Sequence, residues 1–204
     1  MTRSGLDRAR ETQWLQLALK GSDDAFGHLV EAYKGPVFNV CYRLLGDRAE
    51  AEDASQETFL KAYRSLRSYD PERKFSSWLL AIASHHCIDR LRRRRGQWVS
   101  FEELPAEGEP WDPGPGPEAI SHQRERASRV GRLLLRLSPQ DRSVIVLRYW
   151  HDMGMEEIAQ TLALTESAVK SRLHRARREL ASQWLEAEAE RGEVEGLRHG
   201  SPVV

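Results

Sequence analysis

The chain has 204 residues and a formal net charge of zero, because 31 Lys and Arg balance 31 Asp and Glu. Its longest unbroken apolar run is the six residues of 78–83, far short of the ~20 that span a bilayer. It has two cysteines without zinc-ligand spacing, and its N-terminus lacks the apolar core of a signal peptide. These features argue against a membrane span, a disulfide scaffold and a structural zinc site. We expect a cytoplasmic protein without a metal or cofactor.

Helical periodicity dominates the first part of the chain, and no strand-like alternation interrupts it. Ser22 predicts the start of a helix that continues toward Gly46, with Pro36 marking a break or a kink. Asp47 stands three residues before a glutamate, and this variant of the capping box predicts a second helix to about Leu66. A third helix is expected after a proline-containing turn.

The third helix combines an apolar stripe with a basic end. The stripe has the spacing i, i+3, i+4 and i+7, and consists of Phe75, Trp78, Leu79 and Ile82. We therefore expect Trp78 to pack in a core rather than to stack on a base. The basic end consists of Arg90 and Arg92–Arg95, closed by Gly96. Such a cluster suits a nucleic-acid backbone, although a solvated helix end that complements the helix dipole has the same pattern.

Composition changes at residues 97–120, which contain five prolines and six acids but no Lys or Arg, so we expect a flexible linker. Its acids could shield the basic surfaces on either side of it, but a solvated spacer explains them equally well. Helical periodicity returns at 130–137, and residues 121–185 carry 12 basic against 7 acidic side chains. Ser138 predicts the cap of the next helix, and Pro139 takes its first position.

A helix-turn-helix is predicted between Met155 and Arg178, because two amphipathic helices are separated by only Ala163, Leu164 and Thr165. Thr165 is the expected cap of the second helix, which carries basic residues outside its apolar stripe. Such a helix suits the major groove of DNA, and the alternative is an ordinary basic helix of a bundle. The candidate DNA contacts are Glu166, Ser167, Ala168, Lys170, Ser171, Arg172, His174, Arg175, Arg177 and Arg178.

Two separate parts of the sequence resemble one protein family. Thr165–Arg177 resembles the recognition helix of extracytoplasmic-function (ECF) sigma factors of the sigma-70 family, and Leu137–Arg142 resembles the start of the same region. Gly46–Phe59 is similar to the family's helix that binds core RNA polymerase, and Phe75–Leu79 is similar to part of its promoter-melting helix. The matches occur in the family's order and cover most of residues 11–185.

The resemblance implies an all-α protein of two small helical domains joined by a flexible linker. The first domain would bind core polymerase through Asp47, Arg48, Glu50, Glu52, Asp53, Gln56, Glu57 and Phe59. It would hold and open the downstream promoter element through Tyr69, Arg73, Lys74, His85, Arg90, Arg92, Arg93, Arg94 and Arg95. The second domain would read the upstream element. Family members often carry asparagine at His85, so the details of downstream-element readout stay open. They often carry glycine at Ala163, where we expect alanine to cause little strain.

We expect an N-terminal arm with a first helix (1–20), the first domain (21–96), the linker (97–120), the second domain (121–185) and a disordered tail (186–204). The predicted function is a sigma factor without enzymatic activity, with core RNA polymerase and promoter DNA as partners. Family members commonly bind an anti-sigma factor, which no residue here identifies. Two alternatives remain: a helix-turn-helix regulator that acts without core polymerase, and a regulator whose first domain only binds another protein.

Overall fold

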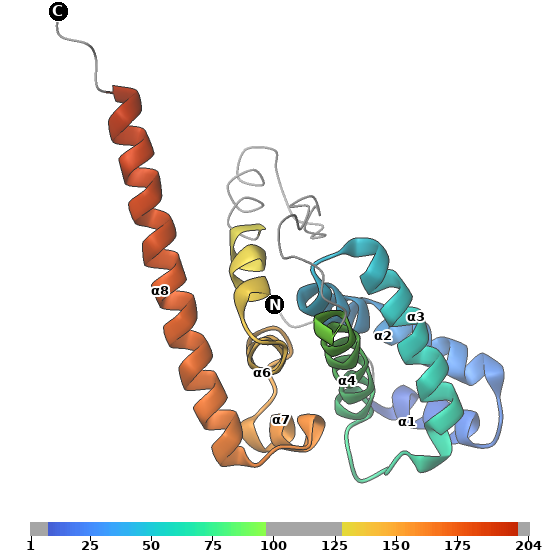
Figure 1. Cartoon of the computed structure of the whole chain (residues 1–204). Coiled ribbons are helices and arrows are strands. Elements are labelled where there is room, and N and C mark those ends of the chain that lie inside the picture. The colour runs from blue at the N-terminus through green and yellow to red at the C-terminus, as the bar shows by residue number, and fades with distance from the viewer. Residues whose placement is uncertain (1–7, 97–127, 200–204) are drawn as a thin grey trace, which may run out of the picture.

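The computed structural model describes residues 8–96 and 128–199, and every regular element within these ranges is helical (Figure 1). The first module comprises α1 (Arg8–Leu19), α2 (Asp23–Leu45), α3 (Arg48–Ser65), a short 3₁₀ helix η1 (Leu66–Ser68) and α4 (Phe75–Gly96). The second module comprises a helical segment over 128–136, α6 (Pro139–Trp150), α7 (Met155–Leu162) and α8 (Glu166–His199). The expected all-α class with two small helical domains is confirmed. The acidic linker, and with it the shielding hypothesis, lies outside the described residues.

In the first module, α2 and α3 begin directly after their predicted capping residues. Ser22 Oγ accepts a hydrogen bond from the Ala25 N–H at 3.3 Å, and Asp47 Oδ1 accepts one from the Glu50 N–H at 2.8 Å. Both bonds satisfy donors that a first helical turn leaves free. Pro36 does not interrupt α2, so the break considered there is absent. The fully buried residues that follow Pro36 in α2 support the helix where one backbone hydrogen bond is missing.

The core of the first module lies between α2, α3 and α4. Its fully buried side chains include Val37, Val40, Leu44, Phe75 and Leu79. Trp78 is half-buried, and its ring centroid lies 5.3 Å from that of Tyr69 and 5.6 Å from that of Phe75. Trp78 therefore belongs to an aromatic cluster at the start of α4, as its place on the apolar stripe predicts.

The second module also follows its local signals. Ser138 Oγ accepts a hydrogen bond from the Asp141 N–H at 3.2 Å, and Pro139 begins α6. Ala163 ends α7 in the left-handed region with φ 52° and ψ 47°, and the following Leu164 N–H bonds to the Ala159 carbonyl at 2.8 Å. An L-residue in this conformation costs about 1–2 kcal/mol. Alanine is therefore strained here, contrary to the expectation of little strain, and this is the physical reason why glycine suits the turn.

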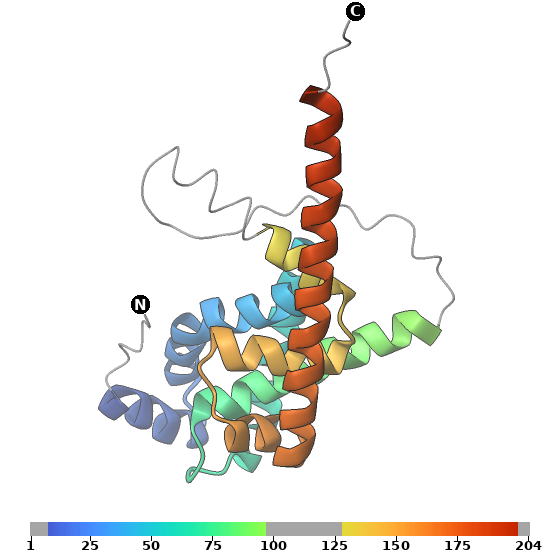
Figure 2. The same ribbon diagram turned by 90° about the vertical axis from the view of Figure 1, so that its left-hand side faces the viewer.

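The last helix is longer than expected, because α8 continues to His199 whereas we expected disorder after residue 185. The guanidinium of Arg129 lies 3.8 Å from the ring centroid of Trp184 and forms an ion pair with Glu188. The segment over 128–136 thus packs on α8 past the helix-turn-helix. The stretch is also rich in alanine and glutamate, which are strong helix formers. The end of α8 projects beyond both modules (Figure 2).

The two modules pack against each other, with α4 beside α7 and α2 beside α6 (Figure 1). Arg142 of α6 donates a hydrogen bond to the Leu44 carbonyl in the last turn of α2. The same guanidinium donates to the carbonyls of Leu135 at 2.5 Å and Leu137 at 3.1 Å. The Leu135 side chain lies so close over Gly46 that a Cβ there would meet it at 2.6 Å. The Arg142 guanidinium thus binds backbone carbonyls that helix ends leave without a partner inside the helix.

A second contact between the modules involves the start of α4. Glu157 of α7 accepts a hydrogen bond from Ser77 Oγ, and its carboxylate lies 3.2 Å from Lys74 Nζ. Elsewhere, the Arg43 guanidinium of α2 lies 4.2 Å from the ring centroid of Trp150 in α6. The contacts of Glu157 place the turn before α4 next to the first helix of the helix-turn-helix.

Candidate DNA and polymerase interfaces

The predicted helix-turn-helix is confirmed: α7 and α8 are joined by three residues. Thr165 Oγ1 accepts a hydrogen bond from the Ala168 N–H at 3.2 Å and so caps α8. Val169, Leu173 and Ala176 of α8 are buried, and this apolar stripe packs toward α6 and α7. The opposite side of α8 is open to solvent.

Most of the candidate DNA contacts lie on that open side. One exposed stripe, with the spacing i, i+4, i+7 and i+11, consists of Ser167, Ser171, His174 and Arg178. Lys170 and Arg177 are exposed on one flank of this stripe, and Arg177 lies 5.9 Å from the ring centroid of Tyr149. Glu166 is exposed at the first position of α8, whereas Ala168 is half-buried.

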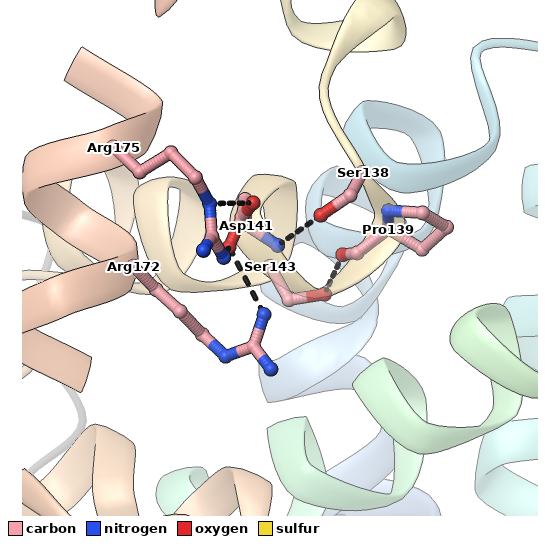
Figure 3. A network of polar contacts seen from close by, with 6 residues as sticks. All are labelled: Ser138, Pro139, Asp141, Ser143, Arg172 and Arg175. Atoms are coloured by element: carbon pink, nitrogen blue, oxygen red, sulfur yellow. Dashed lines mark hydrogen bonds and ion pairs between the residues drawn. The ribbon is translucent and has the colours of Figure 1, made fainter. Parts of the chain in front are cut away.

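Arg172 and Arg175 have a different environment, because both pair with Asp141 of α6 (Figure 3). Arg172 Nη1 lies 3.0 Å from Oδ1, while Arg175 binds both carboxylate oxygens, with Nε at 2.9 Å and Nη2 at 2.7 Å. Burial acts to raise the pKa of Asp141, but the hydrogen bonds from Arg175, Ser138 and Arg172 outweigh burial and lower the pKa overall. The sequence pattern does not predict this pairing, because the partners lie more than 30 residues apart.

The candidate polymerase-binding residues lie along α3, and several already have partners within the first module. Asp47 caps α3, and Arg48 Nε donates to Glu52 at 3.0 Å. Two further acids pair with the basic end of α4: Glu50 with Arg94, and Asp53 with Arg90 at 3.8 Å. Gln56 and Glu57 are exposed, and Phe59 is half-buried against the core. The structure therefore brings predicted polymerase contacts and predicted DNA contacts side by side.

Two large exposed side chains of α3 are not among the predicted polymerase contacts. Leu60 is 48% exposed and Tyr63 is 47% exposed. They follow Gln56 at i+4 and i+7, so the three residues share one exposed stripe of α3. Helical spacing predicts Tyr63 on the inner face of this helix together with Ala62, and the structure corrects this, because Ala62 is buried whereas Tyr63 is half-exposed. The Tyr63 hydroxyl donates to Asp23, and its ring centroid lies 5.0 Å from that of Phe26, so Tyr63 is held in place beside Leu60. A leucine and a tyrosine that are half-exposed on one helix face suit a protein interface.

A basic hollow of about 380 Å³ lies between α3 and the end of α4. Its lining residues are Lys61, His86, Asp89, Arg90, Arg93 and Arg94. Lys61 Nζ lies 2.6 Å from His86 Nδ1, and neither residue was among the candidates. Burial lowers the pKa of His86, and the positive charges of Lys61 and Arg90 lower it further. An uncharged imidazole can accept the hydrogen bond from Lys61 at neutral pH.

The other downstream candidates have diverse environments. His85, Arg92 and Arg93 are exposed on α4, and the Arg95 side chain lies outside the described part of the structure. In the turn before α4, Arg73 lies 3.7 Å from Asp70, and Lys74 contacts Glu157. Tyr69 is buried, with its hydroxyl donating to the Arg73 carbonyl at 2.5 Å, and burial raises its pKa. The Tyr69 ring thus supports the turn from within.

Neither a metal centre nor a membrane span is found in the described parts of the chain. Residues 8–96 and 128–199 contain no group of His, Cys, Asp and Glu that could hold a metal ion. Within the same ranges, no helix combines the length and the apolar character that crossing a bilayer requires.

Two family models match the chain in succession: Sigma-70 region 2 over residues 29–97, and Sigma-70, region 4, over residues 127–180. Over 170 residues the chain is 36% identical to the ECF RNA polymerase sigma factor SigW of Bacillus subtilis (strain 168), covering 80% of this chain and 91% of SigW. It is 34% identical over 180 residues to the RNA polymerase sigma factor CnrH of Cupriavidus metallidurans, covering 85% of this chain and 93% of CnrH.

Solved structures have the same architecture. The structure of CnrH in complex with the cytosolic domain of CnrY matches with a TM-score of 0.63 and 28% identity, over 87% of this chain and 98% of CnrH. The sigma factor RpoE of Bartonella quintana, solved with the anti-sigma factor NepR, has a similar fold, with a TM-score of 0.62 and 21% identity over 77% of this chain and 94% of RpoE. Region 2, region 4 and the curated relatives agree, and the chain belongs to the ECF group of the sigma-70 family of RNA polymerase sigma factors.

Proposed function

We propose that α8 reads the upstream promoter element in the major groove while the first module holds core polymerase. The observation that carries this proposal is the exposed stripe of Ser167, Ser171, His174 and Arg178 opposite the buried face of α8. Hydroxyl, imidazole and guanidinium groups all form hydrogen bonds with base edges, and guanidinium suits guanine in particular. The turn and the cap fix α8 on its module, so the stripe is presented as one surface.

The test is transcription by core polymerase reconstituted with the chain, on a promoter with an intact or a scrambled upstream element. Arg178→Ala should lower initiation from the intact element by about tenfold, the loss of one base or phosphate contact. Arg132→Ala is the matched control, because Arg132 is a solvent-facing arginine of the same module that donates to Ser128. Equal initiation by both variants would contradict the role of α8.

We propose further that α3 binds core polymerase, with Leu60 and Tyr63 at the centre of the contact. Large apolar and aromatic side chains contribute most where an interface is fully desolvated, and a polar, solvent-accessible rim surrounds them. Gln56 and Glu57 would lie in that polar rim. Leu60→Ala should weaken retention of the chain on core polymerase. Leu17→Ala, an exposed leucine of α1, should not, and equal retention of both variants would contradict this surface.

For promoter opening, we propose that the exposed arginines of α4 hold the DNA backbone as the strands separate. Arg92 and Arg93 supply positive charge at the end of the helix, and Lys61 adds to it across the basic hollow. Changing Arg92 and Arg93 to alanine should reduce the permanganate reactivity of promoter thymines while polymerase binding persists. Undiminished reactivity would assign strand opening to other residues.

The solved complexes suggest a further partner. CnrH was solved with the cytosolic domain of CnrY, and RpoE with the anti-sigma factor NepR. We propose that this chain binds a protein of the anti-sigma class in the cytoplasm and that nucleotide addition is carried out entirely by core polymerase. Co-purification of the tagged chain from its own cells would identify such a partner, and recovery of polymerase subunits alone would count against it.

A further inference from the structure

Asp141 is a carboxylate buried between α6 and the recognition helix α8, and its side chain is 4% exposed. It accepts a hydrogen bond from Arg172 and two from the fork of Arg175 (Figure 3). We propose that Asp141 is a positioning residue for promoter recognition, which fixes α8 on α6 and withholds Arg172 and Arg175 from DNA. The proposal rests on the proposed role of α8 as the reading helix.

The charge of Asp141 requires these partners. An ionised carboxylate removed from water is strongly unfavourable unless cations and hydrogen-bond donors surround it. Arg172 and Arg175 supply both, and the two-point contact of Arg175 is the geometry in which guanidinium binds carboxylate most firmly. Moving either arginine to a DNA phosphate would leave the buried charge short of a partner. The pairing therefore opposes such a movement.

The place of Asp141 is itself fixed, because it lies in the first turn of α6. Ser138 caps that turn through the Asp141 N–H, and Ser143 Oγ donates to the Pro139 carbonyl at 2.7 Å (Figure 3). The next residue, Arg142, donates to backbone carbonyls on the other side of α6. Asp141 thus extends from a turn that hydrogen bonds hold in place. Its pairing with Arg172 and Arg175 therefore sets the position of α8 along α6.

The pairing divides the cations of α8 into two sets that the sequence does not distinguish. Lys170 is exposed on one flank of the exposed stripe, and among the described residues it forms no ion pair with an acid. Arg175 lies on the other flank and is bound to Asp141. Phosphate contacts supply affinity that depends on salt, whereas base contacts supply preference for one sequence. We therefore expect Lys170 to act on affinity, and Asp141 with its arginines to act on sequence preference.

The experiment measures promoter binding by the reconstituted holoenzyme over a salt series, with an intact and a scrambled upstream element. Lys170→Ala should reduce the slope of log K against log salt concentration by about 0.9, the loss of one phosphate contact. Arg175→Ala should leave this slope unchanged and reduce the preference for the intact element. Asp141→Asn should make the slope steeper, by as much as about 0.9 for each released arginine, and lower the preference about tenfold.

The results distinguish a positioning role of Asp141 from direct DNA binding by Arg172 and Arg175. If Arg175→Ala lowers the slope as Lys170→Ala does, or if Asp141→Asn matches the wild type in slope and preference, the positioning role is wrong. If Lys170→Ala changes nothing and scrambling the element has no effect, the proposed reading role of α8 fails, and the inference fails with it. Thermal unfolding shows whether Asp141→Asn folds. Should it not fold, Arg175→Ala decides, because Arg172 still pairs with Asp141 in that variant and the loss of the 58% exposed Arg175 side chain leaves no cavity.

Discussion

Replacing Glu157 by glutamine tests the contact between the two modules in the free chain. The Glu157 side chain on α7 is 23% exposed, accepts a hydrogen bond from Ser77 Oγ and lies 3.2 Å from Lys74 Nζ. Glutamine keeps the length of the side chain and an acceptor oxygen but removes the negative charge. The change therefore weakens both contacts without creating a cavity.

The size of the effect follows from the two contacts. A hydrogen bond to a charged group contributes about 1.5–3 kcal/mol, and the lower value applies here because the Glu157 carboxylate is partly exposed. The hydrogen bond from Ser77 to a neutral glutamine would retain about 1 kcal/mol, so its loss is about 0.5 kcal/mol. The ion pair adds about 0.5 kcal/mol, since Lys74 is 69% exposed and its charge is screened by solvent. The net loss is about 1 kcal/mol, or roughly a fivefold shift toward separated modules.

Energy transfer between fluorophores on exposed positions of α1 and α8 measures this shift in the free chain. Glu157→Gln should lower the transfer efficiency. The matched control is Glu156→Gln on the same turn, because Glu156 bonds only weakly to Gln160 of its own helix, at 3.4 Å. Equal efficiencies for the two variants would refute the reasoning that Glu157 holds the modules together.

Three further predictions concern stability and pH. Asp47→Ala removes the cap of α3 and should lower the free energy of unfolding by about 1 kcal/mol; an unchanged urea midpoint would contradict the cap's importance. Leu147→Ala creates a cavity at a fully buried position of the second module and should lower the free energy of unfolding by ~2–5 kcal/mol. Leu185→Ala, at a 69% exposed position, should stay within about 0.5 kcal/mol, so equal midpoints for the two leucines would contradict the assigned core. Burial acts to raise the pKa of Glu157, but the hydrogen bonds that it accepts lower it overall. Its contribution to docking should therefore be complete above the ordinary glutamate pKa of about 4.3 and be lost as the pH falls through the lowered value. Energy transfer that stays constant in acid would count against this.

The features that could be predicted from sequence are those set by neighbouring residues. Ser22, Asp47, Ser138 and Thr165 each cap the helix that follows them, because a short polar side chain reaches the free N–H groups of the next turn. The buried stripe of α8 follows from helical spacing in the same way. Local chemistry therefore located the helix-turn-helix and the surface of α8 that faces solvent.

The features that could not be predicted depend on residues distant in the chain. The sequence gives no reason to distinguish Arg172 from Arg178. Only the fold shows that Asp141 lies next to Arg172. Arg94 at the end of α4 likewise meets Glu50 of α3. Tyr69 could be placed in a turn, but its burial depends on the aromatic rings of α4 that surround it. Periodicity reports which face of a helix is apolar and not which helix covers it.

The most direct measurement of the central claim is transcription in vitro by core polymerase with and without this chain, with every transcript start sequenced. Adding the chain should create initiation at a defined set of promoters that core polymerase alone does not use. These promoters should share two conserved elements at a fixed spacing, one for each module. Starts that stay unchanged on addition of the chain, or that share no upstream element, would contradict the account.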